Sequence, residues 1–475
     1  MAKPPIKPTK NQQPKRRPAP PAIELDINRL NDEGIGIGYF ETKEVLLTGA
    51  LPGERVSFTI EHEGQRRIVG QLRRVLRRSN DRGISSCPQA AECQGCSLIA
   101  MNYPAQLRFK EDKVRRYLGN YPSLNAVQTH PIWAAEHKLG YRTNAKLVMA
   151  KERGKVKIGL YRRGSHEVVD IGNCPLHHPL INHIVGAVKE EVERQGIYIY
   201  NPKTRRGLLR YLTVKVAPAS GKAMVTFVTA ERNFRELTHL GKWLKKKVPD
   251  VVSVQQNVNT AEGNVIFGRD TLKMVGVPDL IDQVGDIRLR IAPTSFFQVH
   301  NEQAARIYAQ VRQWAALQPK ETAVDLYCGI GGIALNLARD AGRVIGIEVS
   351  EEAVRNAREN ARMNERTNCT FLAGDAAELV HDLAMEVAPG SIAVVNPPRS
   401  GCDEEVLTAL AALAPRAMIY VSCNPETLAR DLDLLQRIGY RTEEVQPVDM
   451  FPQTPHVESI VRLTPVPSPQ DKDGK

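Results

Sequence analysis

The chain has 475 residues, enough for roughly two to four domains, and 42% of them are hydrophobic, which is ample for packed cores. No apolar run reaches transmembrane length and the N-terminus lacks the apolar stretch of a secretory signal, so we expect a cytoplasmic protein and exclude a membrane-spanning one. Lys and Arg number 65 against 53 Asp and Glu, a net charge of +12 that points to an anionic partner such as nucleic acid, or serves solubility alone.

Residues 1–21 carry six Lys and Arg, many prolines and no acid, so we expect a disordered basic tail. From residue 22 to about 80, short β-forming runs alternate with glycine turns, which predicts a small β-barrel of the oligonucleotide-binding type. Its last strand and the flanking turns hold seven arginines: Arg66, Arg67, Arg73, Arg74, Arg77, Arg78 and Arg82. Only Asp81 opposes them, so the stripe indicates a surface that binds a nucleic-acid backbone.

Residues 81–288 are predicted to form a β-rich central domain that begins with a cysteine cluster. A helix at about 103–118 in this part is expected to pack on the C-terminal domain. From residue 289 to 465, buried strands alternate with amphipathic helices, which predicts a doubly wound α/β sheet of the Rossmann-like class. Residues 466–475 are expected to be a second disordered tail.

A glycine turn follows the first strand of this α/β domain, in the sequence VDLYCGIGG that ends at Gly332. Glu348 comes nineteen residues after Gly329, at the end of the next strand, where an acid can bind the ribose hydroxyls of an adenosine cofactor. The turn lacks both the pyrophosphate fingerprint and a Walker lysine, so we expect S-adenosylmethionine. Asp375 ends the third strand, where it could meet the adenine amino group or cap the next helix.

Cys423 follows the fifth strand, directly before a predicted helix N-terminus whose dipole is expected to lower the thiol pKa. The alternative is a buried structural cysteine. A thiolate added to C6 of uracil makes C5 nucleophilic enough to take a methyl group, after which a base must remove the C5 proton. Glu458, inside an apolar strand, is the candidate base because burial would raise its pKa; the alternative is an exposed strand residue.

Four further cysteines form a candidate metal site: Cys87, Cys93, Cys96 and Cys174. Three of them lie within ten residues, which is unusual for unrelated buried cysteines. Their spacing is neither the paired C-x2-C of zinc ribbons nor the C-x3-C-x2-C of radical enzymes. The residues alone therefore leave both a 4Fe-4S cluster and structural zinc open.

These motifs resemble the RNA uracil-C5-methyltransferase family, most closely its iron–sulfur branch that acts on 23S ribosomal RNA. The resemblance runs from about Ile23 to Leu463. Its marks are the barrel, the four clustered cysteines, Ser295-Phe296-Phe297-Gln298 with Asn301, DLYCGIGG, Ser422-Cys423-Asn424-Pro425, and the terminal His456-Val457-Glu458-Ser459.

The resemblance implies an RNA-binding TRAM barrel, Cys423 as nucleophile and Glu458 as proton acceptor. It implies S-adenosylmethionine contacts from Gln298, Tyr327, Glu348 and Asn396. It also implies that the four clustered cysteines hold a 4Fe-4S cluster and that the enzyme acts in ribosomal RNA processing. No protein partner is implied, and we expect a monomer. Transfer-RNA members of the family that modify the T-loop lack the barrel and the cluster, which favours 23S rRNA as substrate.

The chain departs from the family at Asn396, where an aspartate is usual, and at Gly332, where some members carry a cofactor-binding asparagine. Three alternatives stay open. Asn396-Pro397-Pro398 resembles the motif of adenine-N6-methyltransferases, although Arg399 stands where those enzymes place an aromatic residue. An RNA cytosine-C5-methyltransferase would use a differently placed cysteine. A non-catalytic RNA-binding assembly factor would use the barrel alone.

Overall fold

The computed structural model describes residues 22–467 except 94 and 264, so both predicted tails lie almost wholly outside the described residues. The chain divides into two compact units, and each is described by itself. The first runs to residue 80 without residues 32–34, and the second comprises residues 32–34 and everything from residue 81 onward.

The first unit is a closed five-stranded barrel with the strand order β1-β2-β3-β5-β4. Its strands are β1 (Ile23–Leu30), β2 (Gly36–Phe40), β3 (Lys43–Leu47), β4 (Arg55–Glu63) and β5 (Arg67–Arg77). Alternate residues point inward, so that Val45, Leu47 and Phe58 are completely buried. Gly70 is required where β5 passes the barrel core, because a Cβ there would lie 2.5 Å from the Phe58 ring.

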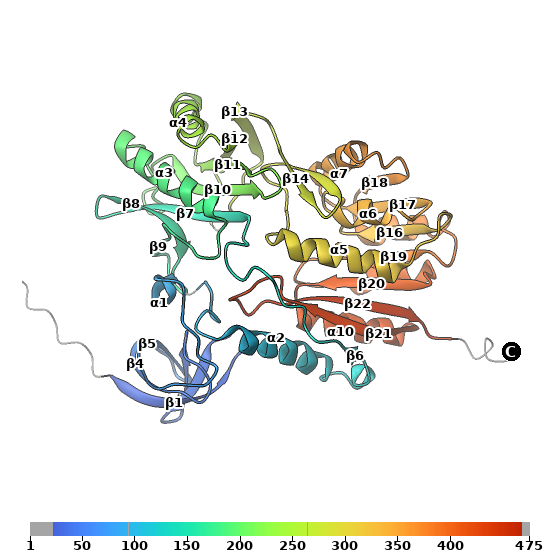
Figure 1. Ribbon diagram of the computed structural model, residues 1–475, viewed down its shortest axis with the longest axis horizontal. Coiled ribbons are helices and arrows are strands. Elements are labelled where there is room, and N and C mark those ends of the chain that lie inside the picture. Colours follow the sequence, from blue (N-terminus) through green and yellow to red (C-terminus); the bar gives the residue numbers. More distant parts are fainter. Residues whose placement is uncertain (1–21, 94, 264, 468–475) are drawn as a thin grey trace, which may run out of the picture. The chain divides into compact units, whose positions relative to one another are not determined.

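The central part of the second unit is a seven-stranded mixed sheet with the order β13-β12-β11-β10-β7-β8-β9. Its strands are β7 (Asn144–Glu152), β8 (Lys155–Tyr161), β9 (Val168–Asp170), β10 (Leu209–Ala217), β11 (Lys222–Thr229), β12 (Val251–Val258) and β13 (Asp270–Gly276). Two amphipathic helices, α3 (Pro179–Gln195) and α4 (Phe234–Lys247), bury their apolar sides against this sheet (Figure 1). A hairpin of β14 (Leu280–Val284) and β15 (Ile287–Ile291) leads on to the C-terminal part.

The C-terminal part is an eight-stranded sheet with the order β18-β17-β16-β19-β20-β22-β21-β6. Its strands are β6 (Gln128–Thr129), β16 (Thr322–Leu326), β17 (Arg343–Glu348), β18 (Cys369–Ala373), β19 (Ile392–Val395), β20 (Ala417–Ser422), β21 (Tyr440–Val448) and β22 (Glu458–Pro465). Strands β16 to β20 are parallel, whereas β22 is antiparallel to both of its neighbours. The order reverses at β16, which is the position where doubly wound sheets bind ligands.

Helices cover both faces of this sheet: α5 (Asn301–Ala315), α6 (Gly332–Leu337), α7 (Glu351–Met363), α8 (Ala376–Leu383), α9 (Glu404–Ala412) and α10 (Pro425–Arg437). The predicted α/β class is thereby confirmed. Helix α2 (Tyr103–Leu118), capped by Asn102, packs on α10, while the short α1 (Ala90–Cys93) and the 3-10 turn η1 (Pro122–Leu124) complete the chain. Within the described residues, none of the helices combines the length and apolar character needed to cross a bilayer.

Candidate active site

A cavity lies at the carboxyl end of β16, beside the glycine turn that opens α6. It is lined by Phe296, Phe297, Gln298, Tyr308, Asp325, Tyr327, Cys328, Gly329, Ile330, Gly332, Ile333 and Asn396. The structure thus brings together Gln298, Tyr327 and Asn396, which lie up to 98 residues apart in the sequence. Tyr327 and Asn396 meet because the carboxyl ends of the parallel strands β16 and β19 lie at one edge of the sheet, whereas Gln298 comes from the segment between β15 and α5.

Glu348 shapes the glycine turn rather than standing free. Its Oε2 accepts a hydrogen bond from the Gly329 amide at 3.1 Å, and its Oε1 accepts one from the Ser350 amide at 2.9 Å. Gly329 needs its glycine because its φ is +55°, and Tyr327 is a non-glycine residue held at φ +59°. The end of β17 therefore fixes the conformation of the turn after β16.

Gly332 accounts for one of the departures seen in the sequence. A Cβ at this position would lie 2.6 Å from the Tyr308 hydroxyl oxygen, so a larger side chain fits only if Tyr308 moves. Tyr308 comes from α5 and is buried, and burial together with the Asp325 and Glu458 carboxylates raises its pKa. The phenol thus fills the space next to the turn and lies near both carboxyl groups.

Asp325, at the end of β16, is a buried acid that the sequence reasoning did not single out. It is 0% exposed, and neither carboxylate oxygen accepts a hydrogen bond of ordinary geometry from the described residues. Burial raises its pKa to about 8, and the nearby Ala334 amide offsets this only in part. A buried carboxylate without a partner facing a cavity favours a cationic ligand, which fits the sulfonium and ammonium groups of S-adenosylmethionine.

Asp375 lies at the N-terminus of α8 and caps that helix. Its Oδ1 accepts hydrogen bonds from the amides of Ala377 at 2.8 Å and Glu378 at 3.3 Å. Asp375 is not among the residues that line the cavity. The geometry therefore matches the helix-cap alternative stated for this residue, and it leaves only Oδ2 for a ligand.

The segment that carries Phe296 and Gln298 is held by the central sheet. Lys215, on β10, donates from Nζ to the carbonyl oxygens of Ala292 at 2.8 Å and Ser295 at 2.6 Å. Thr143 donates from Oγ1 to the Val299 carbonyl at 3.2 Å. Lys215 is buried, and burial lowers its pKa to about 7. The cavity wall is therefore positioned by residues of a different sheet.

Cys423 and Glu458 lie at the adjoining ends of neighbouring strands. Ser422 on β20 pairs with Ser459 on β22, so the residue that follows β20 and the residue that begins β22 are brought together. Cys423 is half-buried, and Asn424 caps α10 directly after it. Glu458 is 4% exposed, so the exposed-strand alternative for this residue does not apply.

The electrostatics of this pair depend on Arg399, which the sequence reasoning treated only as a missing aromatic residue. Burial and the Glu458 carboxylate raise the pKa of Cys423, whereas the Arg399 guanidinium, which bonds the thiol, lowers it. The expected lowering of the Cys423 pKa by the helix dipole is therefore wrong. Burial raises the pKa of Glu458 to about 7, again opposed by Arg399.

Helix α2 holds the loop that leads into Glu458. Lys110 donates from Nζ to Asp449 Oδ1 at 2.5 Å and to the Phe451 carbonyl at 2.9 Å, and Tyr103 donates to Asp449 Oδ2 at 2.8 Å. The side chains of Lys110 and Asp449 are completely buried, and burial lowers the pKa of Lys110. Removing either partner would leave an uncompensated buried charge, so this pair fixes the loop before the candidate base.

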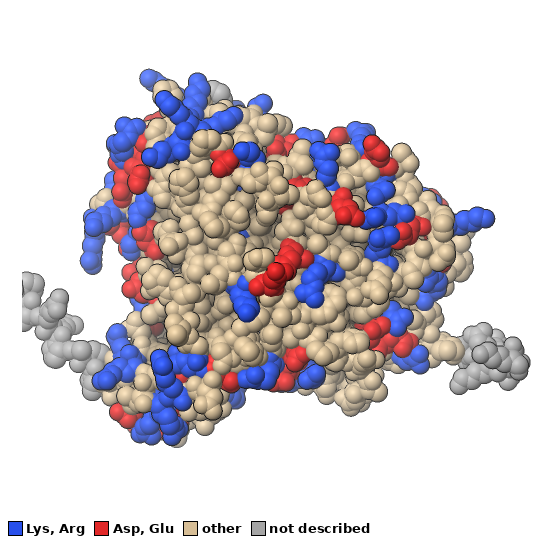
Figure 2. Space-filling view, viewed as in Figure 1, with Lys and Arg blue, Asp and Glu red and all other residues tan. Residues whose placement is uncertain are grey.

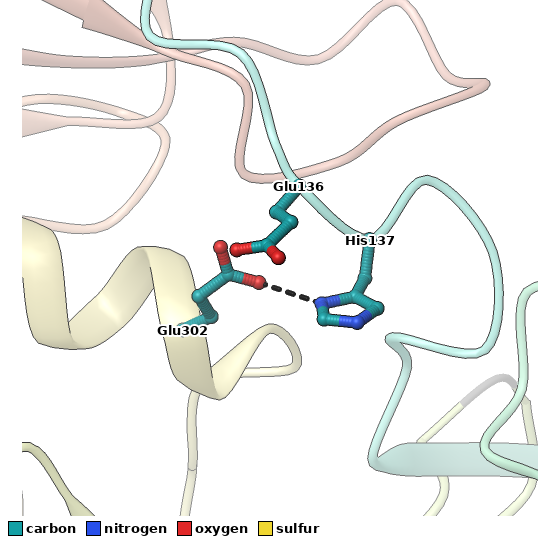
Figure 3. Close-up of side chains that lie close together, drawn as sticks. All are labelled: Glu136, His137 and Glu302. Carbon is teal, nitrogen blue, oxygen red and sulfur yellow. Dashed lines mark hydrogen bonds and ion pairs between the residues drawn. The ribbon is translucent and has the colours of Figure 1, made fainter.

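A second loop, residues 130–143, is fastened to the start of α5. His137 Nδ1 lies 3.0 Å from Glu302 Oε2, with Glu136 beside them, and the nearby Glu302 carboxylate raises the pKa of His137 (Figure 3). Tyr141 stacks on His300 with ring centroids 4.7 Å apart. Glu136 and His137 are exposed, and the contact explains how the loop is docked without calling for a metal ion.

The four clustered cysteines meet in the second unit although Cys174 lies far along the chain from the other three. Burial and the neighbouring thiols raise the pKa values of Cys93 and Cys174, and the same causes raise the pKa of Cys96 to about 12. Cys87, Cys96 and Cys174 pack against a small cluster of buried residues: Ile99, Tyr141, Leu176 and Val299. Four neighbouring thiols form a donor set whose chemistry suits either a 4Fe-4S cluster or zinc.

Comparison with known proteins identifies the family. An RNA methyltransferase of Geobacter sulfurreducens described as uncharacterized is 49% identical over 93% of this chain and 89% of its own length. One from Caldanaerobacter subterraneus is 39% identical over 92% of this chain and 96% of its own. The crystal structure of the Pyrococcus abyssi tRNA (uracil-54, C5)-methyltransferase in complex with S-adenosyl-L-homocysteine matches with a TM-score of 0.74 at 28% identity, over 93% of this chain and 100% of that one. Residues 102–466 match the tRNA (Uracil-5-)-methyltransferase family, so the chain belongs to that family of S-adenosylmethionine-dependent RNA methyltransferases.

Proposed function

We propose that the protein methylates C5 of a specific uridine in 23S ribosomal RNA through a covalent adduct with Cys423. The observation that carries this proposal is the pairing of β20 with β22, which brings a half-buried thiol next to a buried carboxyl group near the cofactor cavity. Adenine-N6 chemistry needs no thiol, and an RNA-binding assembly factor needs neither group.

The Cys423 thiol loses its proton to solvent, and the nearby Arg399 guanidinium stabilises the thiolate that remains. The thiolate adds to C6 of the uracil, which places the electron pair on C5 and the C4 carbonyl. S-adenosylmethionine supplies an electrophilic methyl group. C5 then carries both the methyl group and its proton; Glu458 takes that proton, and the returning electron pair expels the thiolate. With a pKa of about 7, Glu458 can accept a proton and release it near neutral pH.

The cofactor is held by residues around the cavity. Gln298, Tyr327 and Asn396 line it, and Glu348 lies behind the glycine turn where a ribose would bind. Asn396 keeps the oxygen acceptor of the usual aspartate but not its charge. Asp325, whose pKa is raised to about 8, supplies a negative charge nearby once the cationic ligand displaces its proton. Asp375 contacts the adenine amino group through the oxygen that does not cap α8.

We further propose that the clustered cysteines hold a 4Fe-4S cluster. In a tetrahedral zinc site with Zn–S bonds of about 2.3 Å, the sulfurs lie about 3.8 Å apart. Among the described His, Cys, Asp and Glu residues, one group of three has ligand atoms that all lie within 4.8 Å of one another: Glu136, His137 and Glu302. No three of the four cysteine sulfurs are therefore that close to one another. This wider spacing favours a polynuclear cluster, which holds its thiolates farther apart.

A transfer RNA is the second candidate substrate. The Pyrococcus abyssi enzyme, described as acting on tRNA uracil 54, matches 93% of this chain, and the uncovered part is shorter than the barrel. The match therefore extends into the barrel. The presence of a barrel then no longer favours rRNA over tRNA as the substrate. The rRNA assignment then depends on the iron–sulfur branch that the cysteine motif resembles.

Methyl transfer from labelled S-adenosylmethionine tests the proposal. Unmodified transcripts of 23S rRNA and of tRNA are incubated with the enzyme, and the product nucleosides are identified by mass spectrometry. We expect 5-methyluridine at a defined position in 23S rRNA. Label in tRNA alone would overturn the rRNA assignment, and N6-methyladenosine or 5-methylcytidine would overturn the chemistry.

A further inference from the structure

Helix α4 of the central part carries a basic face that the catalytic site does not use. Arg235, His239, Lys242 and Lys246 follow one another at intervals of four, three and four residues, so they lie along one side of the helix. All four are exposed, and Lys245 and Lys247 flank them. At a rise of about 1.5 Å per residue the row is about 16 Å long. Lys and Arg side chains gather over α4 in Figure 2.

The Lys and Arg residues of this face have no acidic partner among the residues that the structure describes. Throughout the described ranges, no ion pair joins Arg235, Lys242, Lys245, Lys246 or Lys247 to any acid, and Glu236 is the only acid on the helix. Other surface helices differ: on α7, for example, basic residues pair with acids one turn away, as in Arg355 with Glu351 and Arg362 with Glu359. The basic face of α4 therefore differs from the charged surface of α7.

Helix stability does not explain the set. Lysines in the last turn interact favourably with the helix dipole, which accounts for Lys245, Lys246 and Lys247. Arg235, however, lies in the first turn, where the dipole disfavours a cation. Lys242 also repels Lys245 and Lys246, which lie three and four residues ahead on the same side of the helix. An unpaired, self-repelling row of cations indicates an anionic ligand.

The buried side of α4 fixes the direction in which these cations point. Leu237, Leu240 and Leu244 are completely buried in the core shared with the central sheet. Gly241 lets the helix approach that sheet closely, since a Cβ there would lie 3.1 Å from side-chain atoms of both Val254 and Val275. The basic residues therefore stand on a rigid support and lose little order on binding a ligand.

We propose that the basic face of α4 binds the phosphate backbone of the RNA substrate, outside the catalytic cavity. The inference rests on RNA being the substrate, and holds whichever RNA is methylated. Lysine and arginine rows of this length neutralise several phosphates, release their counterions and carry no sequence information. The face thus supplies affinity and orientation, while Cys423 and its neighbours select the uridine.

The test is the salt dependence of RNA binding. The triple variant Lys242→Gln, Lys245→Gln, Lys246→Gln and the wild-type protein are titrated with unmodified 23S rRNA and tRNA transcripts in filter binding between 50 and 200 mM KCl. Each lost phosphate contact lowers the slope of log K against log salt by about 0.7–0.9, so we expect the triple variant to lose about 2. The Lys→Arg triple variant should keep the wild-type slope.

A matched control removes three positive charges elsewhere: Arg355→Gln, Arg362→Gln, Arg441→Gln, all ion-paired in the native protein. This control should keep the wild-type slope, and the loss in the α4 variant should appear in the KM for RNA. Equal slopes for the α4 variant and the wild type, or equal losses in both triple variants, would overturn the proposal. Because binding is measured without methyl transfer, these outcomes stand apart from the identity of the methylated RNA.

Discussion

Replacing Glu458 by Gln should abolish methyl transfer and yet stabilise the folded protein at alkaline pH. Burial raises the pKa of Glu458 from 4.5 to about 7, so folding favours its neutral form. The stability that this preference contributes is complete below pH 4.5 and is lost as pH rises through 7. A shift of this size corresponds to about 3 kcal/mol, and more than about 2 kcal/mol of it falls between pH 5 and pH 8.5.

Urea unfolding of the wild type and of Glu458→Gln at pH 5 and pH 8.5 measures this quantity. Glutamine keeps the shape of the side chain and cannot ionise, so the difference between the two proteins isolates the carboxyl group from other titrating residues. The variant should gain more than about 2 kcal/mol over the wild type between the two pH values. A difference that does not change with pH would show that Glu458 ionises freely in the folded protein and would refute the reasoning for its role as base.

Three further predictions concern the neighbouring groups. Arg399→Met removes the cation that lowers the pKa values of Cys423 and Glu458, so the pH profile of kcat/KM should move to alkaline pH. At pH 7 the activity should fall about tenfold for each pKa unit moved, and Arg399→Lys should recover part of the loss. Asp325 is mostly protonated at pH 7, so binding of cationic S-adenosylmethionine should release roughly one proton. Calorimetry in buffers of different ionisation enthalpy measures this release, and the variant Asp325→Asn should show none. Cys93→Ser should lower the iron and acid-labile sulfide content of protein purified without oxygen. Cys369→Ser, which lies outside the cluster, should not lower it. Equal iron and sulfide contents in both variants would argue against the 4Fe-4S assignment.

Local patterns were enough to predict the fold class. The buried parallel strand β19 is a continuous apolar run, and the glycine turn after β16 and the Asn-Pro start of α10 mark where strands pass into helices. The edge strand β6 could not be foreseen, because two residues pairing with β21 from far along the chain leave no local signal. Its pairing depends on the docking of the preceding helix α2 on α10.

The residues of the candidate site that directly follow predicted strands could be identified from the sequence. Gln298, Tyr327 and Asn396 meet at one cavity because the sheet order places their segments together. The predicted lowering of the Cys423 pKa was wrong because burial and the facing Glu458 raise it. The pairing of β20 with β22, which brings Glu458 there, is not visible in sequence spacing. Arg399 was missed for a related reason: its approach to Cys423 depends on the turn that follows β19.

The proposed mechanism requires a transient bond between the Cys423 sulfur and C6 of a uridine. Unmodified 23S rRNA transcribed with 5-fluorouridine offers a ring whose C5 fluorine Glu458 cannot remove as a proton, so the adduct should persist after methyl transfer. We predict a protein–RNA complex that survives denaturing gel electrophoresis, carries the labelled methyl group, and yields a peptide joined to the nucleotide at Cys423. A complex of equal yield formed by Cys423→Ala, or full methylation of ordinary RNA by that variant, would contradict the mechanism.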